Sequence, residues 1–174
     1  VNTWMVARLA AERGLKVALS GLGGDEMFAG YAAFRQVPRL ARALAPLAGW
    51  PGLGRAFRRV STPLLGPKWP GLLEYGTTVP GAWFLRRALF MPWELAGLLG
   101  PERAREGWEA LRPLDRLAEA VAGVSDPTQQ VRALESQWYM RHQLLRDADW
   151  AGTAPGVEIR TPLVDARLTE RIAP

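Results

Sequence analysis

The sequence predicts an α/β fold that is mostly helical, and three neighbouring features at its start carry that prediction. Residues 2–13 show the apolar spacing of an amphipathic helix, and Gly14 is placed to end it. The apolar run "LKVALS" that follows is bounded by Gly14 and Gly21 and is typical of a buried strand. A glycine turn and a second helix start come next. This order is half of an α/β unit with a parallel sheet.

The remainder of the chain predicts a helical body. The pattern becomes helical at Asp25 and continues to about Arg35, and Asp126 with Pro127 is typical of a helix N-terminus. Because one clear strand cannot form a sheet, we expect the other strands to come from sequence outside this chain. Further short helices are expected in residues 38–60, 81–100, 101–123 and after about Asp165, and a short extended segment is expected to end at Thr161.

Composition limits the class of protein. The chain has 174 residues, of which 48% are hydrophobic and 22% charged, so we predict one globular domain over residues 1–174. No apolar run approaches the roughly 18 residues that span a bilayer, so we expect no membrane partner and a cytoplasmic location. Cysteine is absent and His142 is the one histidine, which excludes disulfides, thiolate metal sites and His-rich metal sites within these residues.

The net charge of +5 comes from arginine, because only Lys16 and Lys68 are lysines. Arginine favours phosphate and carboxylate partners, although a biased genome composition explains the excess equally well. The arginines in "GRAFRRV" and "FLRRALF" are either solvated helix faces or a patch that contacts nucleotide, a partner domain or a polyanion; we do not expect nucleic acid. We interpret the eight tryptophans mainly as residues that pack between helices.

The stretch "SGLGGDE" joins the expected strand to the next helix. Unpaired amides at a helix N-terminus bind anions, and glycines let a phosphate approach the backbone closely. The spacing matches neither G-x-x-x-x-G-K-[ST] nor G-x-G-x-x-G. The residues whose amides we predict to bind the phosphates of a nucleotide are Ser20, Gly21, Gly23 and Gly24.

Two adjacent carboxylates follow this turn. Carboxylates repel phosphate unless a cation lies between them, so Asp25 is a natural ligand for Mg²⁺ held on a phosphate chain. Glu26 is either a second contact to the bound cofactor or a partner for the amides of the turn itself. The alternative is purely structural: Asp25 caps the helix and the glycines make a tight turn.

A resemblance to a known family rests on two motifs. "LSGLGGDEMFAGY" is similar to the second ATP-site motif of the asparagine synthase (glutamine-hydrolysing) family. Downstream, "LLRDADWAGTAPGVEIRTPLVDARLTE" resembles a second family signature of the form L-L-x-x-x-D-(R/K)-x-x-M-x-x-x-x-E-x-R-x-P-x-L-D-x-x-L. The matching positions are Leu144, Leu145, Asp149, Glu158, Arg160, Pro162, Asp165 and Leu168.

The resemblance implies the adenine nucleotide alpha-hydrolase-like fold of PP-loop ATP pyrophosphatases, with part of its parallel sheet missing. The chain would be the C-terminal part of the synthetase domain. The first ATP loop, S-G-G-x-D-S, and an N-terminal glutaminase domain would lie upstream in the same chain. We therefore expect these residues alone to be inactive. A homodimer is compatible with this arrangement.

The resemblance also implies a chemistry, that of an ATP- and Mg²⁺-dependent ligase of asparagine biosynthesis. Aspartate attacks the α-phosphate of ATP, which gives an acyl-adenylate and pyrophosphate, and ammonia from glutamine then forms the amide. Which residues are catalytic stays unknown. Glu158 and Arg160 are two apart on an extended segment, so they face the same side and either pair or jointly line the site. Asp147 and Asp149 are either acid/base partners or polar groups at a helix end.

Four positions depart from the family pattern. Leu22 stands where asparagine-forming members often carry glutamate, and Trp150 stands where they carry arginine or lysine. Thr153 and Pro155 also replace the usual residues. One alternative is therefore a relative that adenylates a different carboxylate, for a lactam, a secondary metabolite or a surface sugar. Another is a non-catalytic, arginine-rich helical binding module.

Overall fold

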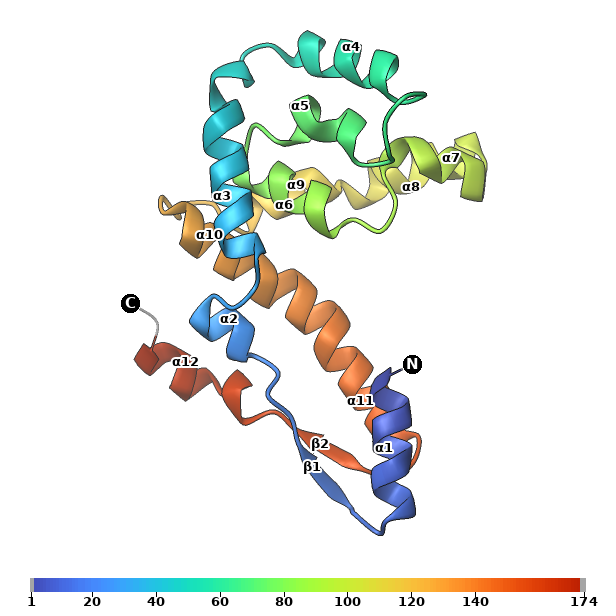
Figure 1. Ribbon diagram of the computed structural model, residues 1–174, viewed down its shortest axis with the longest axis vertical. Helices are drawn as coiled ribbons and strands as arrows, with labels where there is room; N and C mark the ends of the chain where they lie inside the picture. The colour runs from blue at the N-terminus through green and yellow to red at the C-terminus, as the bar shows by residue number, and fades with distance from the viewer. Residues whose placement is uncertain (1, 173–174) are drawn as a thin grey trace. The chain divides into compact units, whose positions relative to one another are not determined.

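The computed structural model describes residues 2–172, which divide between two compact units. One unit, here the sheet unit, comprises Val1–Tyr31 and Glu135–Pro174, and the other, the helical unit, comprises Ala32–Leu134. The structure is mostly helical with a small parallel sheet, as an α/β sequence pattern predicts (Figure 1).

The sheet unit is formed by the N-terminal and C-terminal segments of the chain. Helix α1 packs against α11, and α11 packs against β2. In Figure 1 the blue strand β1 runs beside the red strand β2. The elements of this unit are α1 (Asn2–Glu12), β1 (Val17–Leu19), α2 (Gly24–Phe28), the π-helix η3 (Glu135–Leu144), α11 (Leu145–Thr153), β2 (Glu158–Arg160), the 3₁₀ turn η4 (Pro162–Val164) and α12 (Ala166–Ile172).

Strands β1 and β2 form a parallel pair in which Ala18 lies opposite Ile159. The ladder extends beyond both strands: the Glu158 amide donates to the Lys16 carbonyl at 2.9 Å, and the Ser20 amide donates to the Arg160 carbonyl at 2.8 Å. Strand β2 is the extended segment expected to end at Thr161. We expected every partner strand to lie outside this chain, and this is wrong for one strand. Val17 of β1 pairs with Glu158 of β2, which lies 141 residues later in the same chain.

The helix expected from Asp25 to about Arg35 is interrupted. Helix α2 ends at Phe28 because Ala29 adopts a left-handed conformation with φ 55°, where the Gly30 amide donates to the Asp25 carbonyl at 2.9 Å. Helix α3 then begins anew at Ala33, in the helical unit. Three other expected helix boundaries are confirmed. Gly14 follows the C-terminus of α1 with φ +76°. At helix N-termini, the Asp126 and Asp165 carboxylates accept hydrogen bonds from the amides of Gln129 and Leu168, at 2.8 and 2.9 Å.

The helical unit is built around α6, which packs against α3, α5, α9 and α10. Its core includes Phe34 and Val37 from α3, Trp83 from α6, and Val131 and Leu134 from α10. The elements are α3 (Ala33–Leu44), η1 (Ala45–Leu47), α4 (Pro51–Ser61), η2 (Trp69–Gly71), α5 (Leu72–Tyr75), α6 (Val79–Arg87), α7 (Pro92–Leu99), α8 (Pro101–Leu111), α9 (Pro113–Glu119) and α10 (Pro127–Leu134). Within residues 2–172, no helix is both long enough and apolar enough to cross a bilayer.

The tryptophans differ from their sequence-based interpretation. Trp83 is buried, Trp93 stacks on the Tyr75 ring, and Trp108 meets the Phe84 ring edge-on. Trp50 and Trp69, by contrast, have exposed side chains. Trp4 and Trp150 are also exposed, so half of the eight tryptophans do not serve mainly to pack helices together.

Helices α4 and α5 approach closely at Gly54, which is buried. A Cβ atom at this position would lie 2.9 Å from the Glu74 Cα and 3.0 Å from the Glu74 amide nitrogen. These are backbone atoms that cannot rotate away. The same two helices share an ion pair between Arg58 and Glu74, with 2.6 Å between Nε and Oε2.

Replacing Gly54 by alanine should therefore lower the free energy of unfolding by about 1–3 kcal/mol, because overpacking outweighs the better helix propensity of alanine. Gly52 is the matched control in the same helix, since a Cβ there meets nothing within 4 Å. Urea denaturation followed by circular dichroism measures both. If Gly54→Ala is as stable as Gly52→Ala, the close approach of α4 to α5 is wrong.

Candidate functional site

The glycine turn leaves β1 and enters α2, and part of its hydrogen bonding is internal. The Leu22 amide donates to the Ser20 hydroxyl at 3.3 Å, and the Gly24 amide donates to the Gly21 carbonyl at 3.1 Å. The Ser20 amide donates to β2, as described above. Among residues 2–172 the structure gives no hydrogen-bond acceptor for the amides of Gly21 and Gly23. Of the four amides expected to face an anion, these two are free to do so.

The glycines of this turn meet different surroundings. Gly23 has φ +93°, and a Cβ there would lie 2.9 Å from the Leu163 carbonyl oxygen and 2.9 Å from Val164 Cγ2. Its lack of a side chain is therefore required by the fold. Around Gly21 a Cβ would meet nothing within 4 Å. The turn is thus closed by η4 at Gly23 and open at Gly21, where a ligand can approach the backbone.

The two carboxylates after the turn take different positions. Asp25 is exposed, and its Oδ1 occupies the space that a Cβ at Gly30 would fill. Glu26 is 3% exposed. Neighbouring helical residues point about 100° apart, so the two carboxylates are not aimed at one ligand. No side chain caps α2, whose N-cap is Gly23, so the interpretation of Asp25 as the helix cap is wrong.

Glu26 belongs to a buried polar cluster that the sequence motifs do not reveal. Burial raises the pKa of Glu26; hydrogen bonds with its own backbone amide and with the Tyr31 hydroxyl lower it, and the charges of Glu135 and Asp25 raise it further. Burial, with the nearby Glu26 charge, also raises the pKa of Tyr31. Glu135 is fully buried at the start of the π-helix η3, and the Tyr139 ring, one turn later, meets the Tyr31 ring edge-on at 6.0 Å. One sequence feature could have predicted the burial of Glu135: it follows the buried Val131 of α10 by four residues, which is the spacing of one helix face.

The site offers a metal ion a single carboxylate. Nowhere in residues 2–172 do three or more histidine, cysteine, aspartate or glutamate side chains gather in a way that could hold a metal. Mg²⁺ is usually bound by one or two carboxylates, with substrate phosphates and water completing its shell. Asp25, exposed in the first turn of α2, fits that mode of binding and not a site made by protein alone.

A pocket of about 510 Å³ lies between α1, β1 and α11 in the sheet unit, beside the glycine turn. Its wall includes Ser20, Gly21 and Leu22, and the neighbouring lining is mainly aliphatic. Asp147 on α11 also lines this pocket and accepts a hydrogen bond from the Thr3 hydroxyl at 2.6 Å. Leu22 therefore contributes an apolar side chain where the family often has an acid.

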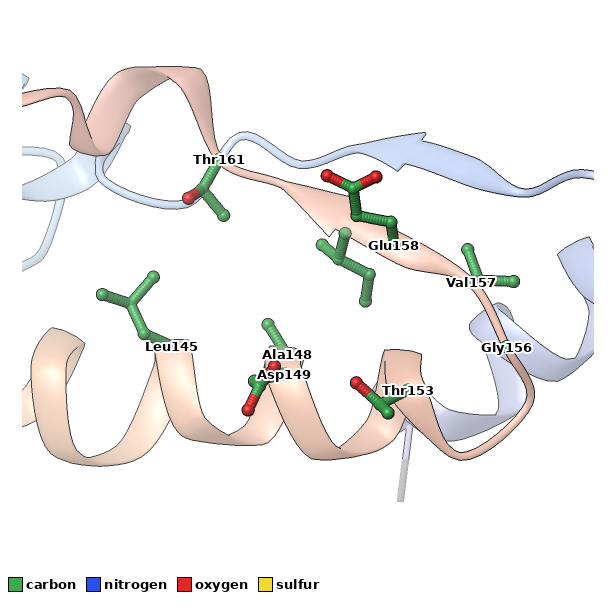
Figure 2. Close-up of a pocket in the computed structure, with 9 residues that line it drawn as sticks. Leu145, Ala148, Asp149, Thr153, Gly156, Val157, Glu158 and Thr161 are labelled. Carbon is green, nitrogen blue, oxygen red and sulfur yellow. The ribbon is translucent and has the colours of Figure 1, made fainter.

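A second pocket, of about 400 Å³, lies between α11 and β2, as Figure 2 shows. Asp149 enters its lining from α11 and Glu158 from β2. Asp147 and Asp149 line different pockets, on two sides of α11. Glu158 and Arg160 do pair, with nitrogen–oxygen distances of 2.8 and 3.1 Å, and this bond lowers the pKa of Glu158.

Trp150, which stands where the resemblance predicts arginine or lysine, is 64% exposed. The guanidinium carbon of Arg146 lies 4.6 Å from the centre of its indole ring, one helical turn away on α11. This is a cation–π contact between exposed side chains. A basic group is thus present next to Trp150 although position 150 itself carries none.

Three comparisons with known proteins extend this description. A family model, Asparagine synthase, matches residues 1–173. No curated protein and no solved structure matches the chain. The family match includes the glycine turn, both pockets and the paired residues of β2. The chain therefore belongs to the asparagine synthase family.

Proposed function

We propose that this chain forms the nucleotide-contacting part of an ATP-dependent ligase that activates aspartate for amidation. The family is one of ATP-dependent amidating ligases acting on a carboxylate substrate. The observation that carries the proposal is the open side of the glycine turn. The Gly21 amide on this side has no acceptor within residues 2–172, nor does the Gly23 amide next to η4, and Asp25 is exposed in the first turn of α2.

Each residue of the turn has a distinct role in the proposal. The amides of Gly21 and Gly23 donate to phosphate oxygens, while the Ser20 hydroxyl and the Gly24 amide hold the turn in shape through their bonds to Leu22 and Gly21. Asp25 would hold Mg²⁺, which when bound neutralises charge on the phosphates. Buried Glu26 has no direct contact with the cofactor in this proposal and bonds instead to its own backbone amide and to the Tyr31 hydroxyl.

In the proposed reaction a carboxylate oxygen of aspartate attacks the α-phosphorus of ATP. A new oxygen–phosphorus bond forms, the bond between the α- and β-phosphates breaks, and pyrophosphate leaves. Ammonia derived from glutamine, in an N-terminal glutaminase domain, then attacks the acyl-adenylate; AMP leaves and the amide forms. Amide donors that are already in place lower the cost of the charge that develops on the phosphates.

A second candidate keeps the adenylation step and changes the acid. Leu22 lines the pocket beside the turn together with aliphatic side chains, and it can neither accept a proton nor hold a charge. A site of this kind suits a carboxylate other than aspartate, or an ammonia step that needs no acid at this position. The binding module without catalysis predicts instead that no acid is adenylated.

The substrate is tested on the full-length protein supplied with ATP, Mg²⁺, glutamine and a panel of carboxylic acids. We expect release of AMP and pyrophosphate that depends on aspartate. Release with another acid and not with aspartate would support the second candidate. No release with any acid, from protein shown to be folded, would contradict both.

The open side of the turn is tested by a matched pair of glycine substitutions. Gly21→Ala should leave the thermal unfolding temperature unchanged, because its Cβ meets nothing, and should reduce the rate of AMP release by tenfold or more, on the order expected for a misplaced substrate. Gly23→Ala should lower the free energy of unfolding by about 1–3 kcal/mol. Full activity in a folded Gly21→Ala protein would make the turn purely structural.

The two carboxylates are tested by titrating Mg²⁺. Asp25→Asn removes the exposed charge and should raise the Mg²⁺ concentration needed for half-maximal AMP release by about tenfold. Glu26→Gln keeps the shape of a buried side chain and should leave that concentration unchanged. An equal shift for both substitutions would place Glu26 at the metal as well.

A further inference from the structure

One stretch of the helical unit carries charge of a single sign. Residues 32–73 contain six arginines and Lys68 but no aspartate or glutamate, although the chain has 17 acidic residues in all. Arg58 is paired with Glu74 from outside the stretch. On α3, Arg35, Arg39 and Arg42 are exposed and spaced along one side of the helix. The α3–α4 part of this unit is therefore a source of positive potential.

Helix α4 divides into three sides. Gly54 and Ser61 are buried on the side that meets α5. Leu53 and Val60, which are seven residues apart, share one exposed flank. Arg55 and Arg59, four residues apart, share the other exposed flank, with small residues between the two flanks. In the described part of the chain neither of these arginines takes part in an ion pair.

Exposed apolar residues also lie before and after α4. Trp50 directly precedes the helix in a non-helical conformation, with φ −123° and ψ 62°, and Leu64 lies in the turn that follows it. The side chains of Trp50, Val60 and Leu64 are 70%, 71% and 78% exposed. Exposed apolar residues gathered on a helix and directly before and after it are typical of an interaction site. We name Trp50, Leu53, Val60 and Leu64, together with Arg55 and Arg59, the α4 surface.

We infer that the α4 surface binds the face of an anionic lipid bilayer. An apolar surface flanked by arginines, with a tryptophan at one end, is the composition of helices that lie in the plane of the membrane interface. Arginine side chains can lay their aliphatic stems along the acyl boundary and place the guanidinium at the headgroup phosphates. Figure 1 shows α4 at one edge of the helical unit, with α5 on its inner side.

The composition of the surface favours lipid over the other polyanions. Nucleic acid would use the arginines and the tryptophan, but it offers nothing to the aliphatic side chains of Val60 and Leu64. A bilayer uses both flanks, because its acyl boundary takes the apolar residues and its headgroups take the cations. The expectation of no membrane partner rested on the lack of a spanning segment, and binding at the interface needs none.

The experiment is co-sedimentation of the full-length protein with vesicles of phosphatidylcholine alone or mixed with phosphatidylglycerol. We expect partitioning onto the mixed vesicles, weakened by salt, and little onto phosphatidylcholine alone. Removing two cations should reduce partitioning by about 25-fold, since each basic residue contributes about fivefold at an anionic surface. Arg55→Gln/Arg59→Gln tests this, and Val60→Ser/Leu64→Ser should cause a loss on the order of tenfold through the apolar flank.

Matched controls separate the α4 surface from net charge and general hydrophobicity. Arg103→Gln/Arg105→Gln makes the same charge change on exposed positions of α8, among glutamates, and should leave partitioning within about twofold of the unchanged protein. Leu98→Ser/Leu99→Ser removes two exposed leucines from α7 and should have equally little effect. Circular dichroism establishes that each variant is folded.

Three outcomes would overturn the inference. The first is no partitioning onto the mixed vesicles. The second is equal losses for the control pairs. The third is partitioning that falls with the arginine pair alone while a single-stranded RNA oligonucleotide binds with the same dependence, which would assign the surface to nucleic acid. AMP release in the absence of vesicles should be the same in all variants, so failure here leaves the proposed ligase activity untouched.

Discussion

The parallel pairing of β1 with β2 is the constraint on which the rest of the sheet unit depends. It fixes residues 17–19 against residues 158–160 and ends with the Ser20 amide bonded to the Arg160 carbonyl. Immediately beyond that bond the chain turns at the glycines on one strand and at η4 on the other. Gly23 then packs directly against the Leu163 carbonyl. Both family signatures are held beside one another by these few backbone contacts.

Sequence reasoning succeeded where the cause is local. The helix ends at Gly14, Asp126 and Asp165 follow from left-handed glycine geometry and from carboxylates that accept neighbouring amides. It failed where the cause is distant in the chain. The burial of Glu26 beside Glu135 depends on tertiary packing, and no spacing rule predicts it.

The candidate site shows the same division. The strand, the turn and the acidic pair were predicted as one unit, yet the structure sends Asp25 and Glu26 to different surroundings. The pairing of Glu158 with Arg160 was one of two predicted arrangements, and strand geometry makes it available. The pocket beside Leu22 was out of reach, because its walls come from α1 and α11 at opposite ends of the chain. Family membership rests on the sequence match over residues 1–173.

The contrast between Gly21 and Gly23 has an evolutionary consequence. Gly23 is required by the fold, through its positive φ and its contact with η4, whereas Gly21 has free space on its open side. A relative that keeps the architecture but no longer handles a nucleotide would be free to change the residue at position 21 and would still retain glycine at position 23. If Gly21 has the proposed role, this pair of positions separates selection for folding from selection for ligand binding.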